Sequence, residues 1–360
     1  MNDVVRLHAP PKGTTFARLA IALAAGQGSG PRAANIATKY DLTTPSVARI
    51  LEKAATSAGS TASTSWAAAN GDFRAAGSEF IELVSQQTII GKLRGVRHVP
   101  FNVRLLLQEE ISPADWVAEN APIPVREGSL AAVQMEAFKI ANIIVLSEEL
   151  MLSGAPNSEA AIRSALVRGA VVGMDKNFLD PAIGAVAGKN PAAITNGAPT
   201  RASTGSSAAA IQADLAALVQ GQIDAGSTLR FCSWTMNPGT ALFLAQLRDS
   251  GERVFPDVEP VGGRLLGIEV LTSTSVQRAG SPISSTIALI DGERVMLADD
   301  RVAAIDVSRE ASIQFSDTPA SGATTAVSLY AANLIAIKVL HVMNWSPVSA
   351  GAVQVLTVAY

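Results

Sequence analysis

Two β-favouring stretches separated by a proline-rich segment restrict what this chain can fold into. Val99–Leu107 and Met135–Leu146 are rich in valine, isoleucine, leucine and phenylalanine, which favour strands. Between them lie one tryptophan, Trp116, and three prolines, Pro113, Pro122 and Pro124. A proline has no backbone N–H to donate, so this segment cannot be a central sheet strand. The sequence therefore predicts a long β-hairpin with an irregular, exposed tip.

A long helix is expected directly after the hairpin. Ser158–Leu179 carries apolar residues at mixed three- and four-residue spacing, which is typical of a helix with one apolar face. Asn157 or Ser158 is the expected N-cap residue. At about 1.5 Å per residue such a helix spans roughly 33 Å, enough to act as a strut.

The rest of the chain predicts an inserted α/β domain. Helices are expected at 208–223 and 238–247, and strands at 230–236, 265–271 and 287–291. The final third, at 295–308 and 327–345, is β-rich, and its strands are expected to pair with strands that precede the inserted domain.

The first 55 residues are more basic than the rest, with seven Lys or Arg against three Asp or Glu. We expect three short helices, at 16–25, 31–39 and 44–55, and then a flexible linker at 56–69. Arg32–Ala55 imitates a helix-turn-helix, although two helices packing on each other explain it better. The sequence thus predicts a basic head with a small core of its own.

Composition points to burial between subunits. The chain is 48% hydrophobic and 16% charged, whereas an ordinary soluble domain carries about 25% charged residues. No uncharged apolar run reaches the ~18 residues of a membrane span, so we expect the excess apolar surface to meet other subunits. The net charge of −3 argues against a surface devoted to nucleic acid. The single cysteine, Cys232, fits a reducing cytoplasm and is expected to be a small buried residue.

No pattern of catalytic or ligand-binding residues stands out. His8, His98 and His341 lie far apart and have no partner at metal-ligand spacing; His341 is expected in a strand. Gly184–Asn190 only superficially resembles a phosphate-binding loop, because it is one residue short and ends in asparagine where Ser or Thr is needed. We therefore expect no catalytic, cofactor-binding or metal-binding residues.

Four stretches, in this order, resemble one known family. They are ADWVAENAPIPVRE at Ala114–Glu127, FKIANIIVLSEEL at Phe138–Leu150 before the long helix, MNP at Met236–Pro238 before a helix ending LRDSG, and LGIEV at Leu266–Val270. The tailed-bacteriophage major capsid proteins show an extended loop with a W-V-x-E core, a returning strand ending S-x-E-L-L, and a spine helix. The chain resembles this family over roughly residues 75 to 345.

The resemblance implies an α+β fold of the Hong Kong 97 type, with an N-terminal arm, an extended β-hairpin loop, a spine helix, and peripheral and axial domains. Carried onto this sequence, the resemblance implies a basic head at 1–58, which is similar to a scaffolding segment that a protease removes in some members. A linker and arm at 59–95 and the extended loop at 96–135 follow. The peripheral domain then covers 136–207, with the spine helix at 158–179, the axial domain covers 208–290, and residues 291–360 return to the peripheral domain.

The resemblance also implies contacts between subunits through the extended loop. Trp116 is the expected apolar anchor, and Pro122 and Pro124 would reduce the entropy lost when the loop lies on a neighbour. Glu119, Arg126 and Glu127 are the expected ion-pairing residues. Some family members join a loop lysine to an asparagine under glutamate catalysis. The tip after Glu119 has no lysine and Tyr330–Asn333 has no glutamate, so we expect no such cross-link.

In function, the resemblance implies a structural protein and not an enzyme. Pentameric and hexameric capsomers would form an icosahedral shell around phage DNA, assembled in the host cytoplasm and ending in the virion. Expected partners are copies of the chain itself, non-specifically bound DNA, and portal, scaffold, protease and decoration proteins, without a cofactor or a membrane. The alternatives are an encapsulin-type nanocompartment shell, a DNA-binding regulator that uses the head, and an unrecognised α/β enzyme.

Overall fold

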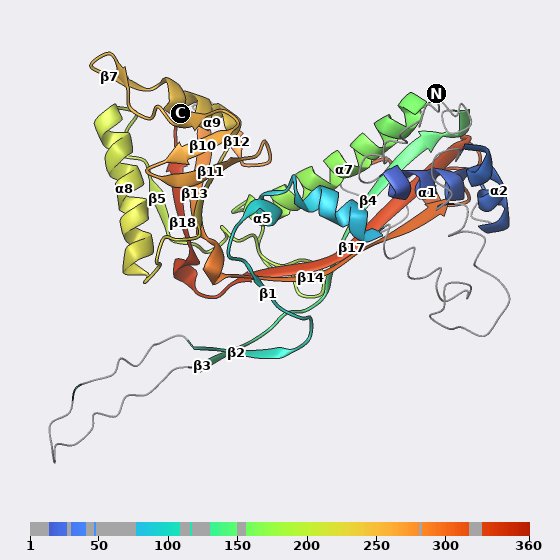
Figure 1. Ribbon diagram of the computed structural model, residues 1–360, viewed down its shortest axis with the longest axis horizontal. Coiled ribbons are helices and arrows are strands. Elements are labelled where there is room, and N and C mark those ends of the chain that lie inside the picture. The colour runs from blue at the N-terminus through green and yellow to red at the C-terminus, as the bar shows by residue number, and fades with distance from the viewer. Residues whose placement is uncertain are drawn as a thin grey trace, which may run out of the picture. The chain divides into compact units, whose positions relative to one another are not determined.

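The computed structural model of the chain describes residues 14–26, 30–40, 47, 77–108, 116, 130–149, 156–280, 283–316 and 326–360. They belong to two compact units, each made from three separate stretches of the chain. The first unit draws on Met1–Thr88, Lys139–Met174 and Asp300–Val342, and the second on Ile89–Phe138, Asp175–Asp299 and Met343–Tyr360. Helices and sheets are mixed throughout (Figure 1), so the fold class is α+β.

One sheet contains the longest strands that the structure describes. Across this sheet the strands are β1 (Arg97–His98), β14 (Val295–Ser308), β17 (Leu334–Pro347) and β4 (Phe138–Ser147). β1 runs parallel to β14, with Arg97 opposite Met296. Because β1 and β4 precede the α/β domain in sequence, the predicted pairing of late strands with early ones is confirmed. His341 lies in β17, as expected, and is buried.

Helices of the first unit pack on one another. They are α1 (Thr14–Ala25), α2 (Gly30–Tyr40), the helix at 77–85 and the start of α7 (Pro156–Leu179). Phe16 of α1 stacks on Phe80 with 4.2 Å between ring centroids. The cluster formed by α1 and α2 also packs against Ile305 of β14. The buried members of this cluster all belong to the head, so its predicted small core is confirmed. The head also packs against Phe80 and Ile305, which lie far away in the sequence.

The spine helix is longer than predicted by two residues. α7 begins at Pro156 and ends at Leu179, so Asn157 and Ser158 lie within its first turn, and the predicted N-cap is wrong. Proline suits the first turn of a helix, because its fixed φ is helical and its missing N–H would have no partner there. The predicted apolar face is confirmed, since Ile162, Leu166, Met174 and Phe178 are buried.

The second unit contains an eight-stranded sheet flanked by helices. Across the sheet the strands are β5 (Thr200–Ala202), β18 (Val353–Val358), β13 (Ser284–Asp291), β6 (Cys232–Met236), β11 (Ile268–Thr272), β10 (Gly262–Leu265) and β9 (Val258–Glu259). The eighth strand, β12 (Arg278–Ala279), pairs with β13. The helices are α8 (Ala208–Asp224) and α9 (Pro238–Gln246). We call this sheet with α8 and α9 the α/β region.

Local chemistry explains where the helices of the α/β region begin. Ser207 accepts a hydrogen bond from the backbone N–H of Ala210, and Asn237 accepts one from Gly239 at 2.9 Å, so each helix has a side-chain N-cap. The predicted helices and the strands at 230–236 and 287–291 are confirmed within a few residues. The strand expected at 265–271 is instead divided by a turn at Leu266 and Gly267, which joins β10 to β11. The predicted return of 291–360 to the peripheral domain needs correction, because β18 near the C-terminus pairs with β13 of the α/β sheet.

The predicted hairpin is shorter than expected. β2 (Arg104–Gln108) pairs antiparallel with β3 (Leu130–Gln134), with Leu106 opposite Ala132. The stretch 135–146 is therefore not the return strand, and most of it forms β4 in the other sheet. Met135 is buried with Met296 and Ala298 of β14, and this packing ends the hairpin before β4 begins.

The remaining elements are short. They are α5 (Ile89–Lys92), the hairpin of β7 (Arg248–Asp249) and β8 (Glu252–Arg253), the pair β15 (Ser312–Ile313) and β16 (Val327–Ser328), and single 3-10 turns at Gly292–Arg294 and Ala350–Ala352. A side chain at Gly292 would come within 1.9 Å of the Arg94 carbonyl oxygen, so only glycine fits there.

Candidate subunit interface

The hairpin of β2 and β3 forms a sheet of its own. Within the part of the chain that the structure describes, neither strand pairs with a third. A two-stranded hairpin is at best marginally stable in water, so it must be held at its base or covered by another surface. Of the residues between its strands the structure describes Trp116, whose side chain is fully exposed.

The base of this hairpin is firmly held within the second unit. Leu105 and Val133, which face each other across the two strands, pack on the buried cluster of Met135, Met296 and Ala298. The Asn102 N–H donates to the Met135 carbonyl at 2.9 Å, and the Asn344 side-chain amide donates to the Glu136 carbonyl at 2.7 Å. The position of the hairpin is thus fixed at its base, while its tip carries a large aromatic residue without cover.

The other predicted contact residues, Glu119, Pro122, Pro124, Arg126 and Glu127, lie outside the described residues. Their role in binding a neighbour stays a prediction. Of the predicted contact residues, the structure describes Trp116, which is exposed.

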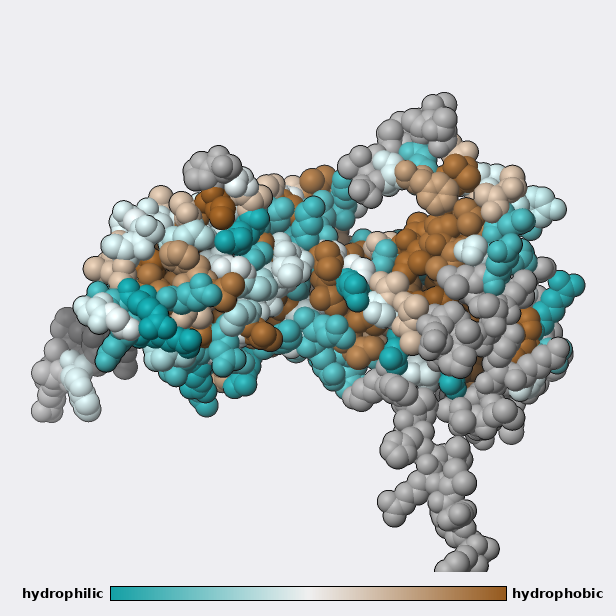
Figure 2. All heavy atoms as spheres, turned by 90° about the horizontal axis from the view of Figure 1, so that it is seen from above, coloured by the Kyte–Doolittle hydropathy of each residue, from teal (hydrophilic) through white to brown (hydrophobic). Residues whose placement is uncertain are grey.

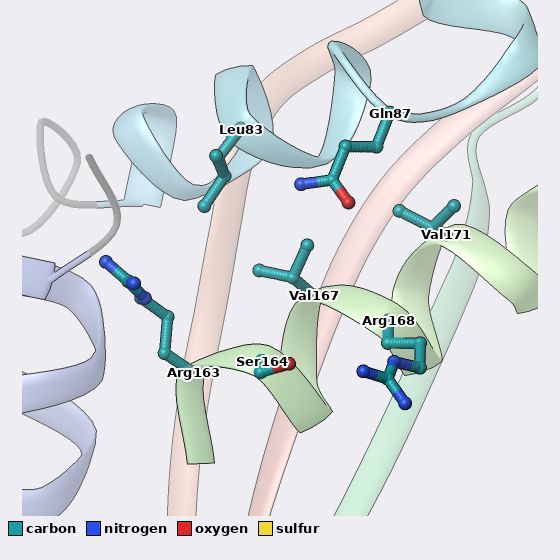
Figure 3. A pocket seen from close by; sticks show the side chains of 7 residues that line it. All are labelled: Leu83, Gln87, Arg163, Ser164, Val167, Arg168 and Val171. Atoms are coloured by element: carbon teal, nitrogen blue, oxygen red, sulfur yellow. The ribbon is translucent and has the colours of Figure 1, made fainter. Parts of the chain in front are cut away.

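A groove that the sequence did not predict lies in the first unit, between α7 and the helix at 77–85. It has a volume of about 410 Å³. Its apolar residues are Leu83, Val167 and Val171, and two arginines of α7, Arg163 and Arg168, also line it (Figure 3). The remaining lining side chains are uncharged, so the charge of the lining is positive. No single-sequence pattern marks this groove, because its two walls are about 80 positions apart.

Arg163 is held in place at one end of the groove. Its Nη1 donates to the hydroxyl of Thr14, the first residue of α1, at 3.0 Å. Arg168, one and a half turns further along α7, is exposed. The groove therefore combines a fixed guanidinium, a solvent-exposed one and an apolar floor, which suits a ligand with both apolar and acidic groups.

The described Cys232 thiol is buried and is not activated. Burial raises the pKa of Cys232 to about 11, with a smaller opposing effect from the hydrogen bond with Ser227. The thiol therefore stays protonated at neutral pH and is a poor nucleophile, and its expected burial is confirmed. Within the described residues, no group of three or more His, Cys, Asp or Glu side chains is arranged to hold a metal ion. None of the described helices is both long and apolar enough to cross a membrane.

Large apolar side chains reach the surface in both units. In Figure 2 they appear as brown areas between teal polar ones. The exposed members include Val103, Ile143, Val172, Val261, Phe315 and Tyr330. Surface of this kind is what the composition predicted.

Comparison with known proteins assigns the fold and the family. A solved structure from Gordonia phage Cozz shares the fold with a TM-score of 0.55 and 18% identity, over 76% of this chain and 87% of that chain. One from Mycobacterium phage Ogopogo has a TM-score of 0.54 and 15% identity, over 76% of this chain and 92% of that chain. The capsid of a native GTA particle has a TM-score of 0.52 and 14% identity, over 77% of this chain and 91% of that chain. The chain therefore has the α+β, Hong Kong 97-like fold of phage capsid proteins.

Sequence comparison agrees with this class. The model of the phage capsid family matches residues 74–354. The capsid polyprotein of Pseudomonas phage PAJU2 is 32% identical over 359 residues, which covers 96% of this chain and 54% of that protein. The chain thus spans about half the length of this relative. It belongs to the phage capsid family. The encapsulin, DNA-binding and enzyme alternatives are not favoured by these matches.

Proposed function

We propose that this chain assembles with copies of itself into the pentameric and hexameric capsomers of an icosahedral shell that encloses phage DNA. The observation that carries the proposal is the β2–β3 hairpin, which is fixed at its base and exposes Trp116 in full. An exposed aromatic residue on a two-stranded hairpin is best explained by burial against another subunit. The GTA capsid that shares the fold was solved with C5 symmetry, which supports five-fold rings.

The finer parts of the proposal follow the same logic. In the capsomer, Trp116 is the apolar anchor, Pro122 and Pro124 stiffen the loop, and Glu119, Arg126 and Glu127 pair with charges of a neighbour. We also propose that assembly takes place in the host cytoplasm, that the shell contacts DNA non-specifically, and that portal, scaffold, protease and decoration proteins are its other partners. Its role is structural, without catalysis by the chain.

Electron microscopy of the purified chain tests the proposal directly. Negatively stained samples should show closed shells, or rings of five and six subunits. A sample of small discrete particles at concentrations up to the micromolar range would contradict it. The sedimentation velocity of the same sample gives an independent measure of particle size.

We propose further that the shell is held together without covalent bonds between subunits. An isopeptide bond needs a lysine, an asparagine and a catalytic carboxylate in contact, and the loop tip at 119–127 contains no lysine. Boiled shells on a denaturing gel should give one band at or below the chain mass of 37.2 kDa. A ladder of pentamer and hexamer multiples is the result that contradicts this prediction.

A further inference from the structure

We propose that the hairpin of β7 and β8 is an electrostatic contact between neighbouring copies of the chain, in which the cationic face of one hairpin binds the anionic face of the next. This inference rests on the proposed function, because it needs several copies arranged in a ring. It names one surface and one kind of interaction, which can be wrong while rings and shells still form.

The two strands of this hairpin place like charges opposite each other. Arg248 of β7 is paired with Arg253 of β8, and Asp249 is paired with Glu252. Residues directly opposite each other in an antiparallel pair have their side chains on the same face, and successive residues of a strand point to opposite faces. One face of the hairpin therefore carries two guanidinium groups, and the other carries two carboxylates.

These four charges have no ion-pair partner within the part of the chain that the structure describes. All four side chains are exposed. Like charges directly opposite each other on two strands are unfavourable. Exchanging the adjacent residues Glu252 and Arg253 would give two opposite-charge pairs from the same composition. The actual order thus weakens the hairpin in the single chain and separates its charges onto two faces.

The hairpin holds its charges in a fixed direction. The Val254 N–H donates to the Leu247 carbonyl at 3.0 Å, and both residues pack against the core of the α/β region, from which the hairpin projects (Figure 1). Ser250 and Gly251, which connect the strands, have φ angles of 50° and 96°, as a tight type I′ turn requires. A charged surface that is already ordered loses little entropy when a partner binds.

A second copy of the chain is the partner that fits both faces. A nucleic acid or an acidic protein would be attracted to one face and repelled by the other. In a ring with head-to-tail contacts, each copy offers its cationic face to one neighbour and its anionic face to the other. Guanidinium and carboxylate groups then form charge-assisted hydrogen bonds around the whole ring. A copy in the reversed orientation would bring like charges together, so the hairpin also selects the direction of packing.

An exchange of two residues tests the contact. The double variant Glu252→Arg with Arg253→Glu keeps the composition and the net charge, but each face then carries one charge of each sign. The midpoint of chemical denaturation should stay the same or rise, because opposite charges now face each other across the strands. The yield of rings and shells in about 0.1 M salt, measured by sedimentation velocity, should fall at least several-fold. This deficit should shrink in about 1 M salt, which screens exposed charges.

Equal yields of the exchange variant and wild type in the lower salt overturn the proposed contact. The matched control is Arg248→Lys with Arg253→Lys, which keeps both charges and should assemble at close to the wild-type yield. An equal loss in this control would show that side-chain shape and not charge is responsible, and would overturn the proposal as well. Failure of wild type itself to form rings or shells contradicts the proposed function instead.

A full inversion of the two faces gives a second measurement. The variant has Arg248→Glu and Arg253→Glu on one face, and Asp249→Arg and Glu252→Arg on the other. Its faces still complement each other from copy to copy, so it should assemble by itself. Mixed with wild type, it should be excluded from wild-type rings at least several-fold, as measured by affinity capture of one tagged chain. An inverted variant that fails to assemble, or that mixes freely with wild type, contradicts the pairing of opposite faces.

Discussion

The α/β region and the β2–β3 hairpin differ in the exposure of their tryptophan side chains. Trp234, in the central strand β6, is completely buried, and its indole N–H donates to the Leu265 carbonyl at 3.0 Å. Trp116, beyond the end of β2, is completely exposed. Every residue of β6 is buried, whereas the hairpin has no neighbouring strand among the described residues. The α/β region is complete within a single chain, whereas on the proposed function the hairpin is completed by a neighbouring subunit.

The α/β region contributes to the stability of the single chain, whereas Trp116 is expected to contribute to assembly. The core of the α/β region joins both helices to the central strands through residues such as Leu215, Leu218, Leu244 and Ile287. Apolar burial of this kind stabilises the single chain by about 25 cal/mol for each Å² removed from water. The same gain at Trp116 is available only when a second copy covers it. Substitutions at the two tryptophans should therefore affect different measurements.

The largest effect is expected from Trp234→Ala. Removing a buried indole from β6 leaves a cavity and removes its hydrogen bond to the Leu265 carbonyl, and should lower the free energy of unfolding by about 3–5 kcal/mol. Chemical denaturation of the purified chain, followed by far-ultraviolet circular dichroism, measures this loss. Trp234→Phe keeps most of the apolar volume and should lose less. If Trp234→Ala unfolds at the wild-type denaturant concentration, the claim that this region is complete in one chain is wrong.

Trp116→Ala should have the opposite profile. The side chain has no cover in the single chain, so the free energy of unfolding should change by no more than about 0.5 kcal/mol. Loss of an anchor that contributes about 2 kcal/mol to a contact weakens that contact more than tenfold. The yield of shells at a fixed concentration, measured by sedimentation, should therefore fall steeply. A destabilised chain with normal assembly would show that Trp116 packs within its own subunit.

Local sequence patterns predicted the elements of this fold better than the pairing between them. The spine helix followed from apolar spacing, and the helix expected at 238–247 is α9. The pairing of β18 with β13 did not follow, because strands about 60 residues apart carry no local sign of their partner. The same reason explains why 135–146 was assigned to the hairpin, and why the stacking of Phe16 on Phe80 was missed.

The candidate interface shows the same limit. The prolines predicted an exposed hairpin tip, and the exposure of Trp116 agrees with that prediction. Its role as an anchor was implied by the family resemblance and stays a prediction. The groove was not predicted, since Leu83 and Val167 lie far apart in the sequence and become neighbours only in the folded chain. A site built from two distant helices has no signature in one sequence without the fold.

A smaller effect is expected where a charge is held inside the packed second unit. Asp175, in the last turns of α7, is 2% exposed. It accepts hydrogen bonds from the Ile89 N–H at 2.8 Å and from the Ser273 hydroxyl at 2.7 Å. Burial raises its pKa above the ordinary value of 3.8, and this outweighs the lowering by the two hydrogen bonds and by Lys92. Asp175 thus connects α7 to α5 and to the end of β11, although removing its carboxylate from water is unfavourable.

This shift fixes the sign of a pH dependence. Between pH 3.8 and the raised pKa, the folded chain binds more protons at Asp175 than the unfolded chain does, so its free energy of unfolding falls as the pH rises through that window. Asp175→Asn keeps an oxygen that can accept from Ile89 but cannot ionise, so it should remove this contribution and be at least as stable as wild type at neutral pH. Asp175→Ala loses the acceptor as well and should be about 1 kcal/mol less stable than Asp175→Asn. Denaturation of the three chains over a series of pH values measures both differences. If the free energy of unfolding of wild type, relative to Asp175→Asn, grows with rising pH in this window, then the hydrogen bonds outweigh burial in setting the pKa of Asp175.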